Sequence, residues 1–255
     1  MLILMNILAF IFGAAVGSFL NVCIYRLPAK TSIVKPSSRC PNCGHSIRYR
    51  DNIPIISFIL LGGKCRDCKS GISWRYPLVE LITAALALML FIKFNFSLDF
   101  FVFFIFTAVL IVITFIDLDH QIIPDILTLP GIPLFFLAAV FLIKIPWQES
   151  LIGLLVGGGT LFLIAFFYEL ISKREGMGGG DIKLLAMIGG FLGWKSLVFI
   201  LLFSSLTGAI IGMAVMTVKK QDMKYAIPFG PFLSAAAIAY IFLGNSYIRL
   251  FLIGY

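Results

Sequence analysis

Charged residues are scarce in this chain of 255 residues: they make up 13% of it, whereas hydrophobic residues make up 60%. A soluble domain is about 25% charged and about 45–50% apolar. The shortage of charge therefore excludes an ordinary soluble domain. The mean hydropathy of +1.05 is that of an integral membrane protein.

Apolar runs divide the chain into eight candidate transmembrane helices. These runs cover residues 2–25, 78–92, 98–116, 126–143, 150–171, 182–194, 197–218 and 226–244. A spanning helix needs about 20 apolar residues, so the run 182–194 is the least certain of them. The sequence thus predicts an all-α polytopic membrane protein with about eight transmembrane helices.

Basic residues are nearly missing from one side of this arrangement. Alternating the eight helices across a bilayer collects 16 of the 20 Lys and Arg residues on the other side. These 16 lie in the segments 26–77, 172–183 and 219–225. The positive-inside rule makes that side cytoplasmic and leaves both termini outside. The net charge of +8 is explained by contact with membrane lipids, so no nucleic-acid partner is expected.

The amino terminus lacks the basic residues that open a cleavable signal peptide, because Met1 to Asn6 carry none. A retained first helix is therefore expected. Three domains follow: a first transmembrane helix (1–25), a cytoplasmic segment (26–77) and a transmembrane core (78–255).

The segment 26–77 contains four of the five cysteines, in two C-x2-C pairs separated by 21 residues. The four are Cys40, Cys43, Cys65 and Cys68. Such a spacing is typical of one Zn²⁺ ion held by four thiolates, a closed and structural site. A pair of disulfides is the alternative, which a cytoplasmic location disfavours. Cys23 is expected to be a small buried hydrophobic residue.

Two acidic residues stand at the edges of apolar runs. Asp117 follows the run 98–116, and Asp181 separates a glycine-rich stretch from the run 182–194. An ionisable side chain at membrane depth costs about 2.5–3.5 kcal/mol or more, so it indicates a functional site. Glycine lets another backbone approach closely, which makes Gly178 and Gly180 candidates for the path of a substrate.

Two carboxyl groups in a dehydrated site separate into one acid and one base, because repulsion and burial disfavour double ionisation. Such a pair can activate water and protonate a leaving amine, which is peptide hydrolysis. Asp117 and Asp181 are the predicted catalytic pair. In the alternative, each aspartate only caps a helix or pairs with a base such as Lys183 or Arg174.

Three further acids receive other interpretations. Asp125 is placed to start the fourth helix, and Asp119 is expected in a solvated loop. Glu80 either pairs with Arg75 or lines the site, and the sequence leaves both open.

Taken together, these motifs resemble those of the type IV prepilin leader peptidases, which are GxGD-type intramembrane aspartyl proteases. The matching stretches are Gly178 to Asp181, Asp117 with Pro124 and Asp125, the two cysteine pairs, Gly17 to Val22, Tyr25 to Pro28, Asn52 to Ser57 and Arg75 to Glu80. The resemblance covers nearly the whole chain. GxGD alone would be less specific, since presenilin-like proteases share it.

The resemblance implies an endopeptidase of the bacterial cytoplasmic membrane with Asp117 and Asp181 as its catalytic pair. It implies removal, at the cytoplasmic face, of the short basic leader of prepilins and pseudopilins. It also implies N-methylation of the new terminus with S-adenosylmethionine, for which no binding residue can be assigned. The oligomeric state and the particular prepilin are not indicated.

Two other functions compete with this interpretation. A lipid-phosphate transferase would use Asp117, Asp119 and Asp125 to hold Mg²⁺, since hard cations favour clustered carboxylates. It leaves the glycine stretch before Asp181 unexplained. A proton-coupled transporter would use the acids as a relay, but the sequence shows no convincing inverted repeat.

Overall fold

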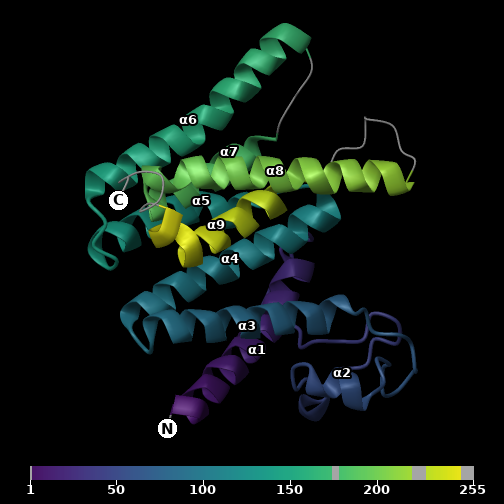
Figure 1. Cartoon of the computed structure of the whole chain (residues 1–255). Helices are drawn as coiled ribbons and strands as arrows, with labels where there is room; N and C mark the ends of the chain where they lie inside the picture. Colours follow the sequence, from purple (N-terminus) through teal and green to yellow (C-terminus); the bar gives the residue numbers. More distant parts are fainter. Residues whose placement is uncertain (1, 174–177, 220–227, 248–255) are drawn as a thin grey trace. The chain divides into compact units, whose positions relative to one another are not determined.

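The computed structural model describes residues 2–173, 178–219 and 228–247, which form helices joined by loops (Figure 1). This part of the chain holds nine α-helices, one short 3-10 helix and no strand. The chain divides into two compact units, residues 1–112 and 113–255.

The first unit is built on α1 (Leu2–Arg26) and α3 (Arg75–Phe94), which lie side by side. Gly13 and Gly17 of α1 face α3 so closely that a Cβ on Gly13 would lie 2.5 Å from Ala87 Cβ. A Cβ on Gly17 would lie 2.7 Å from Glu80 Cα. Small residues four apart let two helix backbones meet, so these glycines allow α1 to pack closely on α3.

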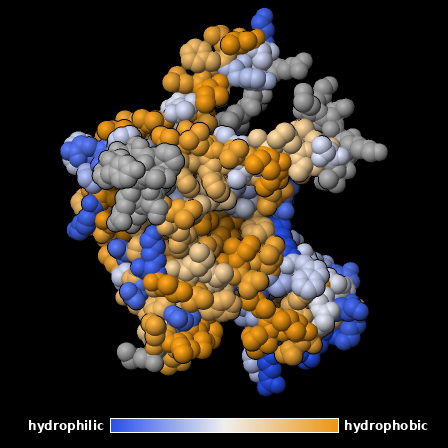
Figure 2. Space-filling model, viewed as in Figure 1, coloured by the Kyte–Doolittle hydropathy of each residue, from blue (hydrophilic) through white to orange (hydrophobic). Residues whose placement is uncertain are grey.

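Between these helices, the chain forms loops with the 3-10 helix η1 (Tyr49–Asp51) and the short α2 (Ile56–Leu60). Hydrophilic residues gather over this segment at the lower right of Figure 2. Backbone hydrogen bonds in its turns hold the segment together, such as those from the Ile47 N–H to the Ser38 carbonyl at 2.9 Å and from the Ile72 N–H to the Gly63 carbonyl at 2.7 Å. Side-chain contacts add to them, including an ion pair of 2.6 Å between Arg66 and Asp51 and an edge-to-face contact of 4.7 Å between Phe58 and Trp74.

The helix α4 (Leu98–His120) begins in the first unit and ends in the second. Its first part adds aromatic rings to the core of the first unit. The Phe100 ring lies 6.3 Å from that of Phe91 and 6.5 Å from that of Phe12.

The second unit contains the end of α4 and five further helices. They are α5 (Asp125–Phe141), α6 (Trp147–Ser172), α7 (Gly179–Leu192), α8 (Trp194–Lys219) and α9 (Gly230–Tyr247). The helix α7 is the core element, with all eight residues from Leu184 to Phe191 buried. It packs on α5, α6, α8 and α9.

Glycines allow the close packing of α6 against α7. A Cβ on Gly157 would lie 2.7 Å from the Leu185 carbonyl oxygen, and one on Gly153 would overlap the Gly189 carbonyl. On the other side, a Cβ on Gly131 of α5 would lie 2.5 Å from Met187 Sδ. Backbone contact on this scale leaves no room for a larger residue, so α7 is held in one position.

Each of the eight predicted apolar runs forms a helix, but eight transmembrane helices are not confirmed. Five helices are long and apolar enough to cross a membrane: α1, α3, α4, α6 and α8. The helix α7 has 14 residues and is about 21 Å long at 1.5 Å per residue, shorter than a hydrocarbon core of about 30 Å. The helices α5 and α9 count only as shorter apolar helices. Hydropathy locates apolar helices, whereas their length decides whether they span.

Candidate active site and candidate metal centre

The four cysteines of the first unit meet in one cluster. The Sγ atoms of Cys40, Cys43, Cys65 and Cys68 lie within 4.8 Å of one another, and those of Cys40 and Cys68 are 3.8 Å apart. Tetrahedral zinc, with Zn–S bonds of about 2.3 Å, requires sulfur atoms about 3.8 Å apart. The cluster can therefore hold a metal ion of this kind.

The two cysteine turns share one backbone arrangement, which explains how they converge. In the first turn the Cys40 N–H donates to the carbonyl of His45 at 2.9 Å, and in the second the Cys65 N–H donates to that of Ser70 at 2.8 Å. Hydrogen bonds from the hydroxyl and then the backbone N–H of Ser70 lower the pKa of the Cys68 thiol to about 6. Thiolate is the form that binds metal, so these hydrogen bonds favour ligation by Cys68.

Glu80, whose role the sequence left open, is a buried acceptor in the first unit. Its Oε2 atom accepts a hydrogen bond of 2.7 Å from the backbone N–H of Ile55, and its side chain is 8% exposed. Ile55 has a φ of +61°, a conformation that costs a β-branched residue free energy. Glu80 therefore holds a strained point of the loop against α3.

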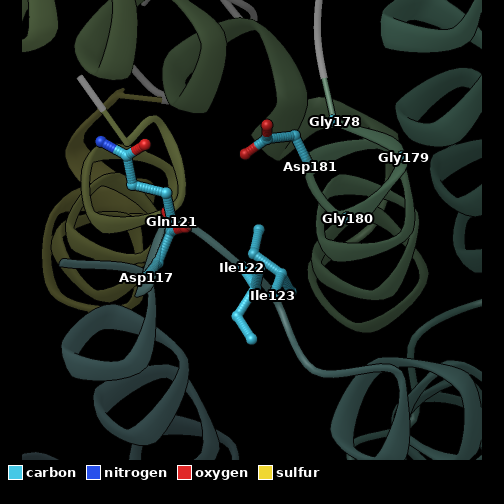
Figure 3. A pocket seen from close by; sticks show the side chains of 8 residues that line it. All are labelled: Asp117, Gln121, Ile122, Ile123, Gly178, Gly179, Gly180 and Asp181. Atoms are coloured by element: carbon cyan, nitrogen blue, oxygen red, sulfur yellow. The ribbon is translucent and has the colours of Figure 1, made fainter. Parts of the chain in front are cut away.

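The two predicted catalytic acids both line one pocket of the second unit, with a volume of about 250 Å³ (Figure 3). Its lining residues are Asp117, Gln121, Ile122, Ile123, Gly178, Gly179, Gly180 and Asp181. Figure 3 shows the Asp181 side chain projecting from the start of α7 toward the side of the pocket that carries Asp117 and Gln121. Acids 64 positions apart in the sequence thus share a cavity.

Asp117 lies in the last turns of α4, because the helix continues through His120 instead of ending at residue 116. Its side chain is 4% exposed. Its Oδ2 atom accepts a hydrogen bond of 3.0 Å from the backbone N–H of Gly230, the first residue of α9. The sequence interpretation missed Gly230, although a glycine between two prolines at the start of an apolar run is a usable signal.

Asp181 lies in the first turn of α7, a helix outside the five candidate spans. Its Oδ1 atom is buried and has no hydrogen-bond partner among the described residues. Burial, and secondly the charge of Asp117, raise the pKa of Asp181 to about 7. Asp181 therefore exchanges its proton near neutral pH.

The glycines before Asp181 differ in their surroundings. A Cβ on Gly179 would meet nothing within 4 Å, and one on Gly178 only the Gly180 nitrogen at 4.0 Å. A Cβ on Gly180 would lie 2.8 Å from Ile123 Cβ. Gly178 and Gly179 therefore leave the pocket mouth open, whereas Gly180 also allows the loop after α4 to pack on α7.

The other acids of this region lie differently. Asp119 is exposed in the last turn of α4, not in a loop. Asp125 begins α5, as predicted, and its Oδ1 atom lies 2.7 Å from Lys183 Nζ. The four cysteines are the only group in the described part of the chain that could hold a metal ion, so Asp117, Asp119 and Asp125 form no such group.

Some predicted features lie outside the described residues. They are Arg174, part of the glycine-rich stretch before Gly178, and most of the basic segment 219–225.

A helical fold with five candidate membrane spans, two carboxyl groups that line one pocket and a four-thiol cluster define the class: a polytopic membrane protein with two acids in one site. Two family models match the chain: the bacterial peptidase A24 N-terminal domain over residues 11–94, and the type IV leader peptidase family over residues 104–213. The chain belongs to the type IV leader peptidase family.

Curated relatives agree with the family models. The chain is 38% identical to the prepilin leader peptidase/N-methyltransferase of Pseudomonas aeruginosa, with 94% of this chain and 91% of the relative aligned. It is 37% identical to the protein of that name from Aeromonas salmonicida, with 96% and 93% aligned. It is 39% identical to the protein of that name from Dichelobacter nodosus, with 89% of this chain and 87% of the relative aligned. No solved structure matches the chain.

Proposed function

We propose that this protein removes the leader peptide from prepilins or pseudopilins, using Asp117 and Asp181 as its acid–base pair. The observation that carries the proposal is the shared pocket of two carboxyl groups. In one of them, Asp181, the Oδ1 atom is buried and has no hydrogen-bond partner in the described part of the chain. The relatives named prepilin leader peptidase/N-methyltransferase supply the substrate class.

The chemistry follows from placing two carboxyl groups beside one peptide bond. The ionised group takes a proton from water, and the water oxygen attacks the scissile carbonyl carbon while the protonated group donates to the carbonyl oxygen. The tetrahedral intermediate then collapses. The carboxyl group that took the proton from water gives it to the leaving nitrogen, and the other carboxyl group takes back its proton from the hydroxyl that re-forms the carbonyl. General acid and base catalysis of this kind contribute about 10²–10⁴-fold each.

Gly178 and Gly180 are proposed to give an extended substrate backbone access to Asp181. The mouth of the pocket is open at Gly178 and Gly179, where an added Cβ would meet no side chain within 4 Å. The placement of 16 of the 20 basic residues favours a cytoplasmic site in a bacterial inner membrane, with both termini outside.

The four cysteines are proposed to hold a structural Zn²⁺ ion, because their sulfur atoms fit a tetrahedral four-thiolate site. When bound, the ion stabilises the fold of the segment between α1 and α3. No open coordination position remains for catalysis in such a site.

N-methylation with S-adenosylmethionine is proposed from the relatives' names alone. The pocket at Asp117 and Asp181 is lined by acids, glycines, isoleucines and one amide, with no aromatic ring among these residues to stack an adenine base. We therefore assign no residue to the methyl donor and derive no step through it.

The competing lipid-phosphate transferase lacks support, because Asp125 pairs with Lys183 and the three aspartates do not converge. Incubation of the purified protein with a prepilin, without added Mg²⁺ and with a chelator that spares tightly held zinc, tests the proposal. We expect a shortened prepilin. An intact prepilin that is cut only after Mg²⁺ is added would contradict the acid pair.

A further inference from the structure

The start of α9 reaches into the acid-pair site. The Gly230 N–H donates to Asp117 Oδ2 at 3.0 Å across 113 sequence positions, and both residues are buried. Among the described residues, the Asp117 carboxylate accepts this one hydrogen bond, which orients it in the site.

Asp117 needs such a donor because of its own position. It lies in the last turns of α4, where the helix dipole presents partial negative charge and opposes a carboxylate. The first turn of α9 presents the opposite end of a dipole and N–H groups without intrahelical partners. The Gly230 contact therefore offsets the unfavourable end of α4.

A side chain at this position would displace the Asp117 carboxylate. A Cβ on residue 230 would lie 2.6 Å from Asp117 Oδ2 and 3.1 Å from Ile123 Cδ1. The backbone of α9 can therefore approach the carboxylate only without a side chain.

Asp181 has no comparable donor among the described residues. Its Oδ1 atom is buried and unpartnered, and Lys183, two positions later, binds Asp125 at 2.7 Å. A hydrogen bond to the ionised form favours ionisation, whereas burial without one favours the neutral acid. The two carboxyl groups are therefore not equivalent.

We infer that Gly230 is a positioning residue that holds Asp117 in its ionised form, which makes Asp117 the base and Asp181 the acid of the first step. The inference rests on the proposed function. In that step Asp117 receives a proton from water, the water oxygen bonds to the scissile carbon, and Asp181 gives its proton to the carbonyl oxygen.

Few other titratable groups surround Asp117. Asp119 and His120 follow it at the exposed end of α4, Asp125 and Lys183 pair on α5 and α7, and Asp181 shares the pocket. On the described part of α9, the Tyr240 ring lies 5.7 Å from that of Phe199, tilted by 52°. The hydrogen bond from the Gly230 N–H is thus a contact that Asp117 has and that Asp181 lacks among the described residues.

The test removes the N–H group alone. Incorporating glycolic acid at position 230 of the full chain replaces the amide by an ester without adding a Cβ. Because hydrogen bonds to charged groups contribute about 1–2 pK units, we expect the acid limb of the cleavage pH profile to move up by that amount. The same ester at Gly208, which removes a main-chain N–H of α8, should leave the limb in place.

Side-chain variants give a second comparison. Gly230→Ala should lower cleavage at least about tenfold, the loss expected when a catalytic group is displaced. Gly208→Ala is the matched control, because its Cβ would lie at an ordinary 3.5 Å from the Phe232 ring. Equal cleavage by the two variants would overturn the inference.

An NMR measurement on the chain with its natural Gly230 tests the same contact even if the variants at position 230 fail to fold. With ¹⁵N-glycine labelling, the Gly230 amide resonance should titrate with pH and shift in Asp117→Asn. The role of Gly230 would be overturned by a resonance that responds neither to pH nor to the Asp117→Asn substitution. It would also be overturned by an ester variant whose cleavage pH profile keeps its acid limb in place. The proposed function would still stand as long as Asp117→Asn and Asp181→Asn fail to cleave prepilin.

Discussion

The Nζ atom of Lys183 lies 2.7 Å from Oδ1 of Asp125, although Asp181 is only two positions away on the same helix. This pairing decides against Lys183 as the partner that would neutralise Asp181. Lys183 instead joins the start of α5 to the start of α7, and the Oδ1 atom of Asp181 stays buried without a partner among the described residues.

The acid pair predicts a clear division among four aspartates. Asp117→Asn and Asp181→Asn should each lower prepilin cleavage by at least about 10²-fold, because each removes one half of the acid–base pair. Asp119→Asn and Asp125→Asn should keep cleavage within a few-fold, since one side chain is exposed and the other forms an exposed ion pair. Gel assays of prepilin processing measure all four. An inactive Asp119→Asn beside an active Asp117→Asn would contradict the assignment.

The surroundings of Gly179 and Gly180 predict that alanine substitutions at these two positions affect cleavage unequally. Gly180→Ala should impair cleavage strongly, since its Cβ would lie 2.8 Å from Ile123 Cβ, whereas Gly179→Ala should be mild because nothing lies within 4 Å. Cleavage rates and melting in detergent compare the two.

Ile123→Gly, added to Gly180→Ala, separates two causes of that loss. If packing on Ile123 is the cause, the double variant should regain cleavage. If a substrate backbone needs the space beside Gly180, cleavage should stay low. A Gly180→Ala variant that cleaves at the normal rate would disprove both accounts.

The cysteine cluster predicts about one Zn²⁺ per chain, the content of a closed four-thiolate site. Cys40→Ser and Cys68→Ser should lower the zinc content and the melting temperature, because metal binding and folding of the segment are coupled. Cys23→Ser, which changes a buried residue of α1 outside the cluster, should leave the zinc content unchanged. Elemental analysis of the purified protein measures the zinc content. A chain that holds no zinc but has disulfides between these cysteines would contradict the proposed metal site.

Glu80 predicts a difference between two substitutions. Glu80→Ala leaves the part-buried Ile55 N–H without its acceptor at 2.7 Å and should destabilise the first unit by about 1–3 kcal/mol. Glu80→Gln retains a carbonyl oxygen and should cost less. Hydrogen exchange at the Ile55 amide gives the measurement, and equal exchange in both variants would contradict the contact.

The sequence by itself determined the helices and the chemical groups of the site. Hydropathy located all eight apolar helices, the C-x2-C spacing indicated the cysteine cluster, and the position of Asp117 and Asp181 at the edges of apolar runs identified the acids. These signals are local, because they depend on composition and on spacings of a few residues.

Tertiary structure alone decided how these groups differ from one another. The donor to Asp117 comes from Gly230, 113 positions away, the partner of Lys183 is Asp125, and Glu80 accepts from Ile55. The short α7 is buried among other helices, so its length and not its hydropathy removes it from the candidate spans. Such contacts follow from how helices pack, and no periodicity within a single helix encodes them.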